Sequence, residues 1–72
     1  MPEIKRVARG WVKVGDDLFN FGNISRIRVL PPYKRVKTYD VVAHGDGLHI
    51  MASFPTEAEA RALLDEIVRL LK

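Results

Sequence analysis

The sequence predicts an α+β fold: an antiparallel, four- to five-stranded meander sheet with one C-terminal amphipathic helix packed on one face. Three observations favour this class. Short segments with period-two hydrophobic alternation fill residues 11–54, turn signals rich in Gly, Asp and Pro separate them, and an apolar stripe with spacings of three and four follows Pro55. Since 72 residues suffice for one small core, we expect a single domain over residues 1–72, with the sheet in 11–54 and the helix in 56–72.

Five segments alternate clearly enough to be assigned as strands, whereas residues 1–10 fit either a short strand or a flexible arm. The expected strands are residues 11–14, 18–21, 24–30, 38–45 and 48–54. In the first hairpin, a turn at Gly15-Asp16-Asp17 places Val14 opposite Phe19 and Val12 opposite Phe21 on the core face. Alternation sends the remaining side chains of this hairpin to the other face, namely Trp11, Lys13, Leu18 and Asn20.

The second hairpin carries the strongest turn signal of the chain, Asp46-Gly47, which is typical of a two-residue type I′ turn. That turn sets the register, with His44 opposite His49 and Val42 opposite Met51. The core face of this hairpin is then expected to contain Tyr39, Val41, Ala43, Leu48, Ile50, Ala52 and Phe54. Between the two hairpins, two prolines and a run of basic residues indicate an exposed loop over residues 31–37.

The C-terminal helix has both a start signal and an apolar stripe. Pro55 ends the last strand, and Thr56 with Glu59 predicts a capping box in which the hydroxyl and the carboxylate each accept from a free backbone N–H group. The stripe expected to cover the sheet consists of Ala60, Leu63, Leu64, Ile67, Leu70 and Leu71.

Composition and motifs exclude several classes of function. The absence of cysteine removes disulfides, thiolate zinc sites and cysteine catalysis. No apolar run approaches the roughly 18–20 residues of a membrane span, and the first residues lack the apolar core of a signal peptide, so we expect a cytoplasmic protein without a membrane partner. Neither serine lies in a nucleophile elbow and no glycine spacing fits a phosphate loop. We therefore expect no enzyme activity and assign no catalytic residue, cofactor or small-molecule substrate.

The two histidines are the one pair whose expected placement suits a metal. The predicted register puts the β-carbons of His44 and His49 roughly 5 Å apart. A zinc site needs three or four ligands, and Asp40 lies four residues from His44, about 13 Å along the strand. No metal site is therefore assigned.

The outer face of the expected sheet predicts a partner. One helix covers only one face, and the other face carries more large apolar side chains than a solvated surface needs: Trp11, Leu18, Val42 and Met51. A core of this size also stabilises a fold only marginally. We therefore predict a non-enzymatic interaction module that forms a homo-oligomer, most simply a homodimer.

The charge distribution supports an alternative function. The net charge is +3, and residues 1–37 hold nine basic and three acidic groups, against three and six in residues 38–72. Cations beside an aromatic ring are typical of surfaces that bind phosphates and stack bases. The residues expected to contact nucleic acid in this way are Arg26, Arg28, Tyr33, Lys34, Arg35 and Lys37. The alternative prediction is sequence-tolerant binding of single-stranded DNA or RNA by the outer face and loop. An acidic protein partner would satisfy the same charge.

A set of core, turn and capping residues also carries a resemblance. They are Asn20, Ile24, Ile27, Tyr39-Asp40-Val41-Val42, Asp46-Gly47 and Phe54-Pro55-Thr56, before a helix rich in Ala and Leu. With them, residues 11–71 resemble the small uncharacterised sheet-plus-helix proteins of bacteria and their phages, which implies the same architecture and such a source, but no particular activity. The order of elements is also similar to that of single-stranded-DNA-binding transcriptional coactivators, from which no site residue is carried over.

Overall fold

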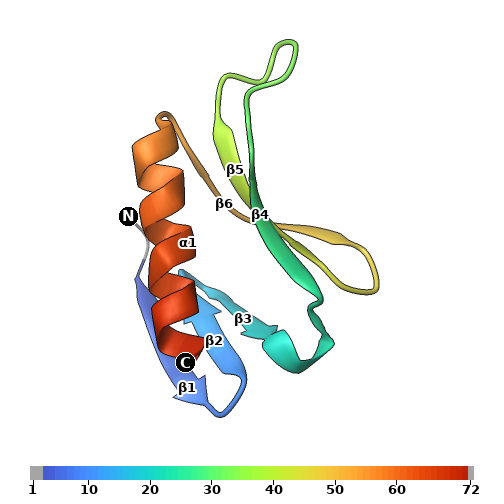
Figure 1. Cartoon of the computed structure of the whole chain (residues 1–72), viewed down its shortest axis with the longest axis vertical. Coiled ribbons are helices and arrows are strands. Elements are labelled where there is room, and N and C mark those ends of the chain that lie inside the picture. Colours follow the sequence, from blue (N-terminus) through green and yellow to red (C-terminus); the bar gives the residue numbers. More distant parts are fainter. Residues whose placement is uncertain (1–2, 72) are drawn as a thin grey trace.

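The computed structural model describes residues 3–71, which form six strands, one 3-10 turn and one helix. In chain order the elements are β1 (Ile4–Ala8), β2 (Trp11–Val14), β3 (Asp17–Asn20), η1 (Phe21–Asn23), β4 (Arg26–Leu30), β5 (Tyr39–His44), β6 (Leu48–Phe54) and α1 (Glu57–Leu71). The strands form two three-stranded antiparallel sheets, β1-β2-β3 and β4-β5-β6. The helix lies beside both sheets, in contact with β1, β4, β5 and β6 (Figure 1).

The predicted α+β class and the C-terminal helix are confirmed, but the prediction of a single sheet is wrong. Residues 1–10, left open above, contribute the additional strand β1. The sheets separate where Asn20 caps η1, its side-chain oxygen accepting a 3.0 Å hydrogen bond from the backbone N–H of Gly22. Because a helical turn cannot continue a strand ladder, β4 begins a second sheet after it.

The first hairpin differs from the predicted register by two residues. Its turn contains two residues, of which Gly15 has a φ of 60°, so that Val14 faces Asp17 and Val12 faces Phe19. A shift of two keeps every side chain on its predicted face, since alternation has a period of two. Val12 and Val14 are accordingly buried in the core.

The second hairpin contains a β-bulge that the sequence prediction missed. Pairing is as predicted from Tyr39 opposite Phe54 to Val41 opposite Ala52, but Val42 then faces Ile50 and Met51 is the extra residue. Between the bulge and the loop, the β6 side chains of residues 48–50 therefore lie on the face opposite to the predicted one, while those of β5 keep their predicted faces. The prediction that Leu48 and Ile50 are core residues is therefore wrong, since their side chains are 54% and 59% exposed.

The predicted type I′ turn is also wrong. His44 pairs with Leu48, so the connection is a three-residue loop, Gly45-Asp46-Gly47, in which the N–H of Gly45 donates to the carbonyl of Gly47 at 3.0 Å. Gly47 does not have the positive φ that a type I′ turn requires.

The core lies between the two sheets and the helix. Its buried members are Val12, Val14, Val41, Ala43, Met51, Phe54, Ala60, Leu63 and Ile67. Three positions of the predicted helical stripe are thus fully buried, whereas Leu71, at its end, is 41% exposed. No helix within residues 3–71 combines the length and the apolar character needed to cross a membrane.

The start of α1 agrees with the capping prediction in most respects. The Thr56 hydroxyl accepts from the backbone N–H of Glu59 at 3.3 Å and donates to the Glu59 carboxylate at 3.0 Å, so the carboxylate binds the hydroxyl instead of a backbone N–H. At the other end, a side-chain hydrogen bond from Arg69 lowers the pKa of Glu66 below its ordinary value.

The loop geometry predicts that its two glycines differ in their tolerance of a side chain. A β-carbon on Gly45 would lie 2.5 Å from the backbone oxygen of Asn23, whereas one on Gly47 would meet no atom within 4 Å. We expect Gly45→Ala to lower the free energy of unfolding by about 1–3 kcal/mol, because the backbone at Asn23 and Ile24 must move. Gly47→Ala should change it by less than about 0.5 kcal/mol. Urea denaturation followed by Trp11 fluorescence measures both, and a greater loss for Gly47→Ala would contradict the three-residue loop.

The bulge predicts which β6 side chain stabilises the fold. Met51 is 6% exposed and Leu48 is 54% exposed. Met51→Ala should cost about 2–5 kcal/mol through lost core packing, and Leu48→Ala less than about 0.5 kcal/mol. Urea denaturation at low micromolar protein measures the free energy of unfolding of both variants. A greater loss for Leu48→Ala than for Met51→Ala would support the predicted register without a bulge.

Candidate functional site

The four residues predicted to form an oligomer face do not form one exposed surface. Trp11 and Leu18 lie on the outer face of the first sheet, 38% and 54% exposed, but Val42 and Met51 are only 0% and 6% exposed. The bulge turns Met51 into the core. Val42 stays on the outer face of the second sheet, but side chains on both neighbouring strands flank it and leave it no contact with solvent. These two residues therefore cannot contribute to a docking face.

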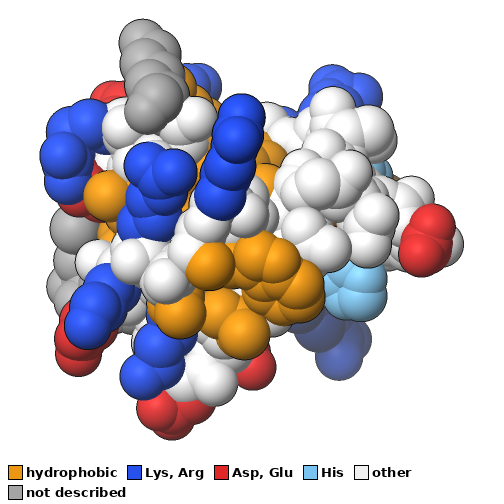
Figure 2. Space-filling view, turned by 90° about the horizontal axis from the view of Figure 1, so that it is seen from below, with side chains coloured by type: hydrophobic (Ala, Val, Ile, Leu, Met, Phe, Trp, Pro, Cys, Tyr) orange, Lys and Arg blue, Asp and Glu red, His pale blue; other side chains and the backbone are white. Residues whose placement is uncertain are grey.

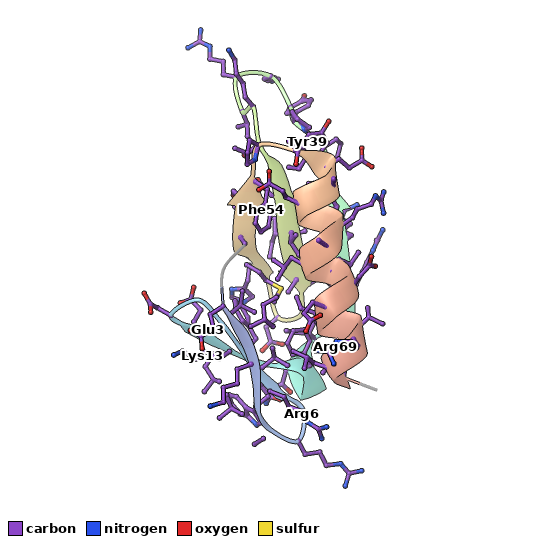
Figure 3. The ribbon with its side chains drawn as sticks, turned by 90° about the vertical axis from the view of Figure 1, so that its left-hand side faces the viewer. Glu3, Arg6, Lys13, Tyr39, Phe54 and Arg69 are labelled. Carbon is purple, nitrogen blue, oxygen red and sulfur yellow. The ribbon has the colours of Figure 1, made fainter. Side chains whose placement is uncertain are left out.

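The bulge instead exposes a different apolar group at the free edge of β6. Leu48 and Ile50 line a groove between β3 and β6, and Leu18 joins them from the opposite side, so that each of the three is more than half exposed. We call Leu18, Leu48 and Ile50 the edge cluster. Strands β3 and β6 end different sheets and do not pair with each other, so each presents unpaired backbone groups along the groove. Figure 3 shows β6 as the outer strand of its sheet, beside the Phe54 label.

Strand β6 also differs from the other strands in its charge. Within residues 3–71, each of β1 to β5 contains at least one Lys, Arg, Asp or Glu, and β6 contains none. Charged side chains on edge strands are a common protection against pairing with other chains. The β6 edge lacks this protection.

The six residues predicted to contact nucleic acid follow one line along β4 and the loop beyond it. Arg26 and Arg28 project from the outer face of β4, and Tyr33, Lys34, Arg35 and Lys37 lie in the loop. Residues 31–37 are all exposed, which confirms the loop prediction, and the loop projects past the rest of the molecule (Figure 1). At the turn within this loop, the Val36 N–H donates to the Tyr33 carbonyl at 3.0 Å. The Lys34 Nζ lies 5.2 Å from the centre of the Tyr33 ring.

One hydrogen bond orients a cationic side chain on this face. The Nε of Arg28 donates to the Nε2 of His44 at 3.2 Å, which requires a neutral imidazole with its proton on Nδ1. The predicted opposition of His44 and His49 is wrong, because His44 pairs with Leu48 while His49 pairs with Ala43 and points to the other face. Among residues 3–71 no group of three or more metal-ligating side chains comes together.

A third surface lies at the C-terminal end of α1. Seen from this end, hydrophobic side chains gather beside several Lys and Arg side chains (Figure 2). The groove there is lined by Phe21, Ile24, Ser25, Arg26, Ile27, Leu64, Val68 and Leu71. Nothing in the described residues indicates what would occupy it, so we assign it no function.

Comparison with known proteins identifies no relative: no protein-family model, curated protein or solved structure matches the chain. The resemblance to small bacterial and phage proteins therefore stays a prediction, and function has to be inferred from the surfaces described above.

Proposed function

We propose that this chain is a non-enzymatic interaction module that works as a homodimer, in which β6 of one copy pairs antiparallel with β6 of a second copy. The observation that carries the proposal is the edge cluster. Leu18, Leu48 and Ile50 are 54%, 54% and 59% exposed beside an uncharged edge strand. Exposed aliphatic groups of this size next to unpaired backbone are typical of docking edges.

The charge of the surface favours a second copy as the partner. In a twofold antiparallel pair the strand meets its own copy, so a strand whose charged side chains all have one sign brings like charges together. The other edge strands carry such charges, for example Lys5 and Arg6 on β1 and Arg26 on β4. Strand β6 can meet its own copy without this repulsion, and pairing there keeps the basic regions of two positively charged chains apart.

Burial of the edge cluster contributes a driving force for pairing. Full burial of a Leu or Ile side chain stabilises by about 1.5–3 kcal/mol, and a symmetric pair contains two copies of each. Backbone hydrogen bonds between the paired strands add affinity and fix the orientation of one strand relative to the other. These gains are offset by the free energy lost when two chains become one particle, estimated at about 4–15 kcal/mol. Since the side chains of the edge cluster are already partly buried in one copy, each gains only about half of the full-burial figure on pairing.

A charge at the centre of the pairing edge should dissociate the dimer. Ile50→Lys places one ammonium group from each copy at the same contact, and should raise the dissociation constant by about a hundredfold or more. The fold should survive, because Ile50 is 59% exposed. Sedimentation velocity over a range of micromolar concentrations gives the mass, and circular dichroism reports folding.

The matched control is Val7→Lys. Val7 is an aliphatic residue on the edge strand β1 with 54% exposure, so the same change in charge there should leave the dimer intact. A native chain that remains monomeric at high micromolar concentration would refute the proposal. If Val7→Lys dissociates the dimer and Ile50→Lys does not, the dimer contact lies at β1 instead of β6.

A further inference from the structure

The outer face of β4-β5-β6 is the face opposite to the core that α1 and the first sheet form with this sheet. The register places Arg26 beside His44 and Arg28 beside Val42 on this outer face, while the alternate residues Ile27 and Val29 point to the core. Arg26 is exposed and Arg28 is half-buried. The two guanidinium groups therefore start a basic line along the strand.

Arg28 is oriented before any ligand arrives. Its hydrogen bond to His44 uses the Nε–H group, which leaves the four N–H groups of the two terminal nitrogens for an acceptor in solution. Among residues 3–71 it makes no other hydrogen bond or ion pair. A guanidinium held in one orientation loses less side-chain entropy when it binds an oxyanion.

The loop that follows β4 continues the basic line. From Arg26 to Leu30 the strand extends about 13 Å, and the chain then enters the loop with Lys34, Arg35 and Lys37. Tyr33 is 70% exposed, with the Lys34 ammonium over its ring. The carboxylate of Asp40 lies beside this line, opposite Leu30, and accepts a 2.9 Å hydrogen bond from the Thr38 hydroxyl.

We propose that this line, from Arg26 through Arg28 to the 31–38 loop, binds the phosphate backbone of a single-stranded nucleic acid, with Tyr33 stacking on a base. Unpaired cations supply the charge for phosphates, and an exposed aromatic ring at a loop tip suits bases that are not paired. A duplex fits less well, because the one helix of the described chain packs its apolar stripe in the core and has Glu57 and Glu59 in its first turn. This surface does not include β6, so the proposal stands apart from dimerisation.

Salt dependence of binding tests the proposal. Fluorescence anisotropy with a labelled oligothymidine, between about 50 and 200 mM salt, should give a plot of log affinity against log salt with a slope of about −2 to −3.5 for three to five phosphate contacts. Removing both loop cations by Arg35→Ala with Lys37→Ala should flatten the slope by about 1.4. Tyr33→Ala should weaken binding about 5- to 150-fold.

The anchoring role of Arg28 has a matched control on the helix. Arg28→Ala should weaken binding roughly tenfold or more, whereas Arg61→Ala removes the same charge from an exposed side chain that pairs with Glu57 at 3.0 Å, and should have no effect. Circular dichroism confirms that each variant is folded. Equal losses for the two variants would overturn the proposal, because they would mean that net charge alone drives binding.

Three further outcomes would also overturn it. One is no binding of the oligothymidine at low salt with micromolar protein. Another is tighter binding of a labelled duplex than of the single strand. The third is equal binding of polyglutamate, which would indicate an acidic protein as the partner. The variant Ile50→Lys keeps every residue of the basic line. If it loses the dimer but keeps the salt dependence of binding, the nucleic-acid surface is separate from the dimer contact.

Discussion

One extra residue in β6 decides which side chains of the second hairpin reach the core. Without the bulge at Met51, strict alternation would bury Leu48 and Ile50 and expose Met51. With it, Met51 packs among Val41, Ala43 and the helix, and the first half of β6 is reversed. Both the long three-residue loop and the exposed edge cluster follow from this change. The surface proposed for dimerisation exists because the strand is bulged.

Local signals predicted the parts of the fold that local interactions determine. The capped helix and its buried stripe at Ala60, Leu63 and Ile67 follow from spacing and capping chemistry alone. The first hairpin was predicted with the correct faces although its register was off by two, since only an odd shift exchanges the faces. The exposed loop followed from its prolines and charges.

Tertiary packing determined the rest. The segment Gly45-Asp46-Gly47 is compatible with a two-residue or a three-residue loop, and the preference for Asp-Gly in type I′ turns favoured the shorter one. The bulge at Met51 decides between them, and in the three-residue loop Gly45 lies close to the Asn23 carbonyl, far away in sequence. The division into two sheets coincides with η1, where Asn20 caps a helical turn between the strands expected at residues 18–21 and 24–30. The error in the register of β6 removed Met51 from the candidate surface, whereas Val42 keeps its predicted face and is lost because it has no exposed surface.

Pairing at β6 would also organise the basic lines. A twofold axis perpendicular to the sheet keeps both outer faces on one side, so two sheets of three strands become one of six. With neighbouring strands about 4.8 Å apart, the two copies of β4 lie five intervals, or about 24 Å, from each other. Each copy contributes Arg26 and Arg28, and the two lines run in opposite directions. A flexible strand held by one line then meets the second at a high effective concentration, which raises affinity without any new contact. Loss of β6 pairing removes that gain and leaves the contacts of each line intact.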